Sequence, residues 1–282
     1  MRIGFHISIA GGFKNILERA KQRGCTTIQL FSRNPRGWKY NPLDEDDITL
    51  FKQEMKNENI APVFVHMPYL PNLASSKTDL RKRSLDSLIE DLIRSEKIGA
   101  QYLIMHIGSS EDKDTGLRLM VDGINQALLE VGNTIILLLE NTAGSGNELG
   151  FRFEEIRAII DGVDKDERIG LVLDTAHAFE AGYDLATREA VSNTVAEFDK
   201  IIGLKKLHLI HLNDSKTKLG SHSDRHWHIG KGEIGKGLGY LLNHRLLRDK
   251  PFIMETPRTN LKEDLMNMKV VRRLLARLRD KQ

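Results

Sequence analysis

The feature that most limits the fold of this chain is an alternation between two hydrophobic periods, repeated eight times. Short apolar runs rich in β-branched residues lie at 2–8, 26–32, 61–67, 102–108, 134–141, 169–176, 206–213 and 251–256. Between these runs, apolar residues recur at steps of three and four, as at Leu85, Leu88 and Leu92. The first pattern is typical of buried strands and the second of helices with one buried face. The chain is therefore predicted to alternate strands and helices along its length.

Eight such repeats in 282 residues favour a single (β/α)₈ TIM barrel that occupies 1–282 as one domain. An open, doubly wound sheet is the alternative. Against it, Gly11 and Gly12 follow the first run without the G-x-G-x-x-G spacing of a dinucleotide-binding turn. The glycine-rich stretch 230–235 lacks the Gly-Lys-Ser/Thr ending of a phosphate loop, so we interpret it as a tight loop.

The composition is that of a folded, water-soluble protein. Hydrophobic residues at 40% and charged residues at 29% exclude a disordered, collagen-like or disulfide-scaffold chain. Cys25 is the single cysteine, so an internal disulfide is impossible and a reducing compartment, the cytoplasm, is expected. No apolar stretch approaches the roughly 18 to 20 residues of a membrane span, so no membrane association is expected. A net charge of +3 neither requires nor excludes a polyanionic partner.

Residue types that bind metal ions stand at the ends of six of the eight apolar runs. They are His66, His106, Glu140, Asp174, His211 and Glu255. In a barrel, the C-terminal strand ends meet at one mouth, where active sites lie. A single residue of this kind is more often structural, but chance would scatter six of them onto helices and strand starts. In the seventh run, Leu207, Leu209 and His211 should share one face, which predicts His211 in the mouth and His208 in the wall.

Two short arrangements add further candidates for metal binding: Asp174-x-x-His177 and Asp224-x-His226. Histidine and carboxylate without thiolate are typical of zinc or a similar divalent ion in a catalytic site. One zinc takes about four ligands, some of them water, so nine candidates indicate two or three ions that share carboxylates. Clustered metal ions suit the hydrolysis of phosphate esters.

The remaining histidines are assigned smaller roles. His6 also ends a run and is interpreted as an outer-sphere residue or a substrate contact. The other four are interpreted as wall, loop or helix-surface residues: His208, His222, His228 and His244.

Three stretches of the chain resemble the endonuclease IV family of apurinic/apyrimidinic (AP) endonucleases. They are Val-His-Met-Pro-Tyr-Leu at 65–70, Leu-Asp-Thr-Ala-His-Ala-Phe-Glu-Ala-Gly-Tyr-Asp at 173–184, and His-Leu-Asn-Asp-Ser-Lys at 211–216 with its continuation through 220–226 to 229–235. The likeness extends over the whole chain. Many family members carry cysteine where Ala176 stands here, at a position that is not a ligand. The resemblance implies a TIM barrel with a trinuclear zinc centre.

The resemblance also distributes the nine candidate ligands among three Zn²⁺ ions. The three sets are His66, His106 and Glu140; Glu140, Asp174, His211 and Glu255; and His177, Asp224 and His226. Glu140 would bridge the first two ions. Glu140 or Glu255 would in addition be catalytic, by helping to deprotonate the attacking water.

The activity implied by the resemblance is hydrolysis of double-stranded DNA on the 5′ side of an abasic site, in base excision repair. The products would be a 3′-hydroxyl and a 5′-deoxyribose phosphate, and blocked 3′ ends would also be trimmed. The damaged nucleotide must leave the helix to reach a deep mouth, and the unstacking cost, on the order of a few kcal/mol, is lowest where the base is missing. Arg36, Tyr69 and Leu70 match the family's DNA-contacting loop positions. A monomer is expected.

Two functions of other kinds remain alternatives. A sugar isomerase or epimerase shares a barrel with one or two divalent ions, but has no use for the additional trio His177, Asp224 and His226. A non-catalytic nucleic-acid-binding barrel predicts missing ligands, and all nine candidates are present.

Overall fold

Eight parallel strands form the central sheet of the computed structural model, which describes residues 1–257 and 260–279. The strands are β1 (Ile3–Phe5), β2 (Ile28–Phe31), β3 (Val63–His66), β4 (Tyr102–His106), β5 (Ile136–Glu140), β6 (Ile169–Asp174), β7 (Leu207–His211) and β10 (Phe252–Met254). Their hydrogen-bonded order is β1-β10-β7-β6-β5-β4-β3-β2, and a parallel bridge between His6 and Gln29 closes the ring. The (β/α)₈ barrel is confirmed, and the open sheet is excluded.

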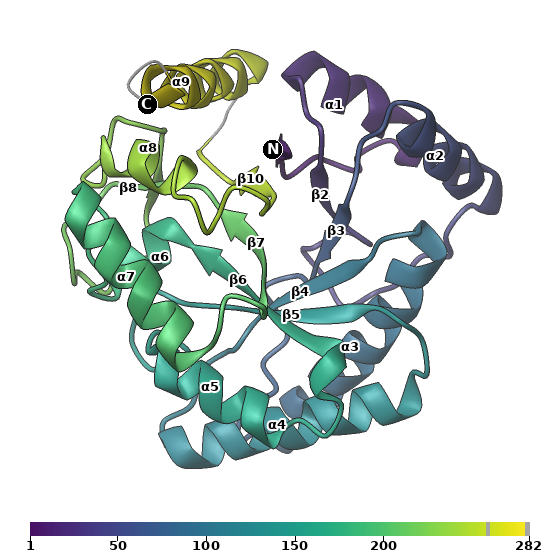
Figure 1. Ribbon diagram of the computed structural model, residues 1–282. Helices are drawn as coiled ribbons and strands as arrows, with labels where there is room; N and C mark the ends of the chain where they lie inside the picture. Colours follow the sequence, from purple (N-terminus) through teal and green to yellow (C-terminus); the bar gives the residue numbers. More distant parts are fainter. Residues whose placement is uncertain (258–259, 280–282) are drawn as a thin grey trace.

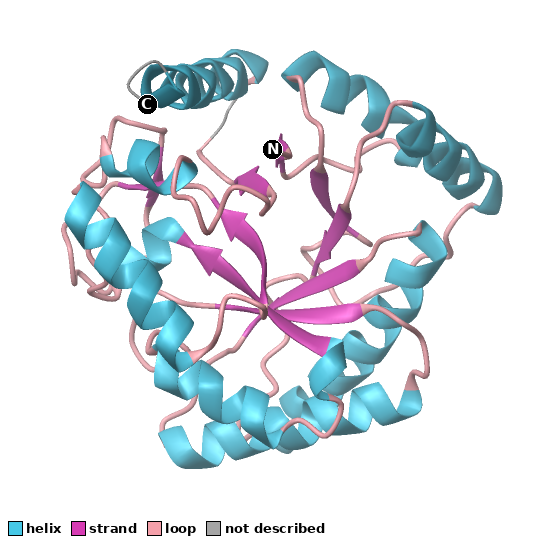
Figure 2. Cartoon of the chain, in the orientation of Figure 1, coloured by secondary structure: helices cyan, strands magenta, loops and turns pink. Residues whose placement is uncertain are grey.

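Helices surround this ring of strands (Figures 1 and 2). They are η1 (Phe13–Asn15), α1 (Ile16–Arg23), α2 (Glu45–Asn57), α3 (Thr78–Ile98), α4 (Lys113–Glu130), α5 (Phe153–Gly162), η2 (Asp166–Arg168), α6 (Thr175–Glu180), α7 (Arg188–Ile201), α8 (Gly237–Leu242) and α9 (Leu261–Arg279). Side-chain caps set several starts: Asp44, Asp112 and Thr187 each accept a hydrogen bond from the backbone N–H three residues later. Within 1–257 and 260–279, no helix has the length and apolar character required to cross a bilayer.

The apolar core has two layers, separated by the sheet. The outer layer lies between the strands and the helices. The inner layer fills the barrel and consists of one residue from each of six strands: Phe64, Ile104, Leu138, Val172, Leu209 and Ile253. Side chains alternate between the two faces of a strand, so a residue two positions beyond any of these again points into the barrel. The inner layer is thus the floor of the mouth.

Strand β7 departs from this alternation because it carries a β-bulge. The pairing of β6 with β7 shifts between Leu171 and Val172, so that one residue of β7 is left without its own partner. Leu207 packs in the outer layer, whereas the His208 ring contacts Tyr102, which packs against the inner layer. The predicted inward direction is therefore correct for Leu209 and His211. The placement of His208 in the wall is wrong, because the bulge turns it toward the interior.

The position of His208 predicts a pH-dependent loss of stability. Burial, followed by nearby Lys250 and Lys206, lowers the pKa of His208 to about 4. In the unfolded chain, His208 would bind a proton at its ordinary pKa near 6.5. The folded state therefore has its full free energy of unfolding above pH 6.5 and loses part of it as the pH falls toward 4. We expect that loss to be about 1 to 2 kcal/mol, allowing for the partial exposure of the ring. Urea unfolding of wild type and His208→Gln at pH 7 and pH 4.5 measures it as the difference between the two proteins. Equal losses in both would contradict the assignment.

Candidate metal centre

Six of the nine predicted ligands form the next inward-facing layer, directly above the barrel floor. Each lies two residues after a member of the inner apolar layer: His66, His106, Glu140, Asp174, His211 and Glu255. Five of them are the last residues of their strands, and Glu255 directly follows β10. The period of two that directs the floor residues inward therefore directs these polar side chains into the mouth. The placement predicted from the ends of the apolar runs agrees with the structure.

The Glu140 carboxylate lies at the centre of the site and faces two groups of ligands. Its Oε2 is 3.0 Å from His66 Nε2 and 3.5 Å from His106 Nε2. Its Oε1 is 2.8 Å from His211 Nδ1, which is in turn 3.4 Å from an oxygen of Glu255. Two sets have ligand atoms that all lie within 4.8 Å of one another: His66, His106 and Glu140; and Glu140, Asp174, His211 and Glu255. The two oxygens of Glu140 are thus divided between two candidate ion positions.

A third group forms beside these two from Asp174, His177 and His226. Asp174 caps α6, and its Oδ1 accepts a hydrogen bond from the His177 backbone N–H at 2.9 Å, which explains the Asp-x-x-His spacing. The antiparallel pair β8 (Asp214–Ser215) and β9 (His226–Trp227) returns the chain to the mouth, so that His226 Nε2 lies 3.4 Å from Asp174 Oδ2.

Asp224 borders this third group from the solvent side. Its Oδ1 is 3.4 Å from His177 Nε2 and 3.8 Å from His226 Nε2, and its side chain is 48% exposed. The expected trio His177, Asp224 and His226 therefore lies together, and Asp174 is shared between the second and third groups. All nine candidate ligands converge on the mouth.

Three of the five candidate histidine rings are held by a backbone carbonyl so that Nε2 faces the cluster. His66 Nδ1, His177 Nδ1 and His226 Nδ1 each face a backbone carbonyl oxygen, at 2.6, 2.9 and 3.2 Å. Because a carbonyl can only accept, these Nδ1 atoms carry a proton, and Nε2 is the ring nitrogen that faces the cluster. The Nε2 atoms of His177 and His226 are only 3.1 Å apart. Two ring nitrogens this close need a shared proton or a cation between them, and with Asp174 and Asp224 beside them the residues present fit a bound metal ion.

The charges of the site favour cations as well. Burial raises the pKa of Glu140, but His211 and His106 outweigh it and hold this pKa well below the ordinary range. Burial lowers the pKa of His106 to about 4, so its ring is neutral and free to donate a lone pair. Four carboxylates gathered in one mouth need compensating positive charge, since buried anions are costly unless paired or bound to metal. A metal cofactor satisfies both this charge and the ring orientations.

The comparisons with known proteins agree with this geometry. Residues 17–281 match a family model described as the xylose isomerase-like TIM barrel. The chain is 47% identical over 261 residues to a probable endonuclease 4 of Halothermothrix orenii, covering 92% of this chain and 94% of the relative. It belongs to the endonuclease IV family.

A solved structure of the endonuclease IV family superposes on nearly the whole chain. The crystal structure of endonuclease IV from Thermus thermophilus superposes with a TM-score of 0.89 at 34% identity, covering 98% of this chain and 100% of that one. A D-tagatose 3-epimerase-like protein superposes with a TM-score of 0.74 at 17% identity, covering 100% and 99% of the two chains, a likeness of fold alone. The barrel is thus shared with sugar epimerases, whereas the sequence identity lies with the endonucleases.

Three amide side chains that hold the candidate ligands of this endonuclease IV family member were not singled out from the sequence. Gln29 accepts from His211 Nε2 at 2.7 Å and donates to Glu255 Oε1 at 2.5 Å. Asn213 donates to Asp174 Oδ2 at 2.6 Å, and Asn141 Oδ1 accepts from the Asp174 backbone N–H at 2.7 Å. Such outer contacts fix ligand orientation. The signal that could have found them is an amide inside or at the end of an otherwise apolar run.

His6 occupies the same outer position. Its Nδ1 lies 2.9 Å from Gln29 Nε2 and 3.5 Å from Glu255 Oε1. This agrees with its interpretation as an outer-sphere residue. The glycine-rich stretch 230–235 is also a tight loop, because the Asp214 carboxylate accepts hydrogen bonds from the backbone N–H groups of Gly232, Ile234 and Gly235.

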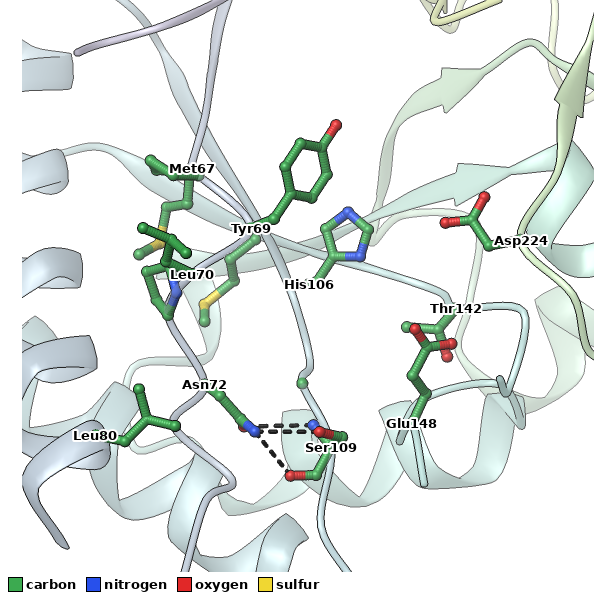
Figure 3. Close-up of a pocket in the computed structure, with 14 residues that line it drawn as sticks. Met67, Tyr69, Leu70, Asn72, Leu80, His106, Ser109, Thr142, Glu148 and Asp224 are labelled. Carbon is green, nitrogen blue, oxygen red and sulfur yellow. Dashed lines mark hydrogen bonds between the residues drawn. The ribbon is translucent and has the colours of Figure 1, made fainter. Parts of the chain in front are cut away.

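The predicted DNA-contacting side chains Tyr69 and Leu70 lie at the rim of the mouth. Tyr69 is 70% exposed and Leu70 is 39% exposed, which argues against simple core packing. The Tyr69 ring lies 5.7 Å from that of His106, and both line a pocket of about 370 Å³ that Asp224 also borders. Figure 3 shows Tyr69 and His106 side by side, with Asp224 across from them. The pocket therefore adjoins the candidate metal ligands.

Arg36 lies exposed in the loop after β2. The loop is attached to the protein body by Arg33, which is buried and donates to the Gly37 carbonyl at 2.5 Å. Arg33 also lies over the Tyr40 ring at 4.4 Å and 3.7 Å from the Asp91 carboxylate. Arg36 is thus presented to solvent by an anchored loop on the mouth side of the barrel.

Proposed function

We propose that this chain is a zinc-dependent AP endonuclease that cleaves DNA on the 5′ side of abasic sites, leaving a 3′-hydroxyl and a 5′-deoxyribose phosphate. Removal of blocking groups from 3′ ends belongs to the same proposal. DNA cleavage at abasic sites follows from membership of the endonuclease IV family and from relatives named endonuclease 4. The observation that carries the metal count is the division of nine ligands into three adjoining groups that share Glu140 and Asp174.

The residues of the mouth would bind three metal ions and accept a proton during hydrolysis. His66, His106 and Glu140 would hold the first ion, with Glu140 shared by the second. The remaining ligands would complete the second and third positions: Asp174, His211 and Glu255; and His177, Asp224 and His226. Bound divalent ions would supply a water of lowered pKa and positive charge at the phosphate. Glu140 or Glu255 would assist by accepting a proton from the attacking water.

The rim residues would select the lesion. Tyr69 and Leu70 stand beside the pocket with exposed apolar surface, which suits insertion into a stack from which a base is missing. Arg36 would contact a backbone phosphate from its anchored loop. The nucleotide without a base would then reach the ligands at the cost of less unstacking than an intact one. We further propose that the protein acts as a monomer.

The decisive experiment is incubation of the purified protein with a duplex that carries one tetrahydrofuran abasic analogue. We expect a single cut 5′ to the analogue, loss of the cut after treatment with a chelator, and its recovery on adding Zn²⁺. Product ends are identified by gel mobility and by their ability to prime a polymerase. An undamaged duplex of the same sequence is the control. Persistence of intact abasic DNA with the fully metallated protein would exclude the proposed function.

A further inference from the structure

We infer that Glu180 is a positioning residue that holds the loop carrying Asp224 and His226 in place for the third group of ligands. The inference rests on the proposed function, because that function assigns this group to a metal ion. Glu180 is the last residue of α6, and none of its surface is exposed. It is a buried carboxylate that the proposed chemistry does not use.

The Glu180 carboxylate is bound to both ends of the 215–226 segment. Its Oε1 accepts hydrogen bonds from Ser215 Oγ at 2.7 Å and Thr217 Oγ1 at 3.1 Å, where the segment leaves β8. The same oxygen accepts from the backbone N–H of Arg225 at 3.2 Å, where the segment returns. Arg225 lies between Asp224 and His226 in the chain. One carboxylate thus fixes the backbone between two ligands of the third group.

Backbone contacts from the same end of α6 reinforce this attachment. The carbonyl of Glu180 accepts from His222 N at 3.0 Å, and that of Phe179 accepts from Gly220 N at 3.1 Å. Most side chains of the segment itself are exposed, so it has little apolar burial with which to hold a conformation. A buried carboxylate persists only when hydrogen bonds replace its hydration, and these donors come from the loop. The loop and the carboxylate therefore stabilise one another.

The test is made on the metal-free protein with trypsin, whose sites Lys216, Lys218 and Arg225 all lie exposed in this segment. Glu180→Ala should raise the rate of cleavage at these three sites about tenfold, because the open loop is populated more. After reconstitution with Zn²⁺, this variant should bind one ion fewer than wild type by elemental analysis. Glu180→Gln keeps a carbonyl oxygen for the Oε1 contacts, so it should restore both the cleavage rate and the ion count.

Two further variants keep the inference falsifiable. Glu155→Ala removes another buried carboxylate, which accepts from Gly150 N at 2.9 Å, and should leave loop cleavage and ion count unchanged. If Glu180→Ala does not fold, the double variant Ser215→Ala/Thr217→Val removes two of the loop's donors and should give the same increase in cleavage. Wild-type cleavage and ion count in Glu180→Ala, or in the double variant, would overturn the inference. Failure of wild type to cut abasic DNA would overturn only the proposed function, since proteolysis of the metal-free protein requires neither metal nor DNA.

Discussion

Glu140→Gln is expected to reduce the incision of abasic DNA by roughly three orders of magnitude, a loss of about 4 kcal/mol in transition-state stabilisation. The reason is the division of its two oxygens between His66 and His106 on one side and His211 on the other. Glutamine keeps the shape but offers one acceptor oxygen and no charge. We therefore expect both a lower ion count and a smaller rate constant, measured by elemental analysis and by single-turnover incision.

The control for Glu140→Gln is Glu155→Gln, which neutralises a buried glutamate that belongs to none of the three ligand groups. This control should retain the full ion count and wild-type incision. A Glu140→Gln protein that keeps all its ions and cuts at the wild-type rate would refute the bridging role. Retention of all ions with a slow rate would instead assign Glu140 to proton transfer alone.

His226→Ala is expected to remove one ion and to lower turnover by about two to three orders of magnitude. His226 Nε2 lies 3.1 Å from His177 Nε2 and 3.4 Å from Asp174 Oδ2, so its loss opens the third group while Glu140 keeps its contacts in the first two. Binding of abasic DNA is measured separately, on protein whose metal ions have been removed with a chelator. This binding should change much less than turnover. The effect is therefore expected in kcat more than in the dissociation constant.

His228→Ala supplies a matched control from the same segment of chain. His228 lies two residues further on and contacts the amide of Asn267 at 3.2 Å, outside the ligand groups. Its loss should leave the ion count and turnover unchanged. Unaltered turnover in His226→Ala, with the third ion absent, would show that this ion has no part in catalysis.

The fold and the ligand positions could be predicted because both follow from a local period. Phe64 and His66 share one face of β3, as Leu138 and Glu140 share one face of β5, so the residue that fills the floor also fixes the direction of the ligand above it. Parallel strands then bring these ends to one mouth. The strand pattern alone was therefore enough to predict that these six candidate ligands lie together.

The features that escaped prediction depend on pairing between distant segments. A β-bulge is a mismatch between two strands, so the alternation within β7 could not show that His208 turns inward. Glu180 looks like an ordinary polar residue of a short helix until Ser215 and Arg225 are placed beside it. Gln29 likewise gains its role only when His211 is folded against it. Period and spacing within one segment carry no information about such partners.

The order in which the chain is synthesised has a consequence for when it can cut DNA. The first ligand group is complete once Glu140 has been made, but the second also requires Glu255, which directly follows β10. Strand β10 is the one that pairs with both β1 and β7 and so joins the two ends of the sheet. The last ligand is thus delivered by the same step that completes the barrel. A nascent or partly unfolded chain therefore lacks the complete set of candidate ligands, and under the proposed function it would not cut DNA before the barrel has closed.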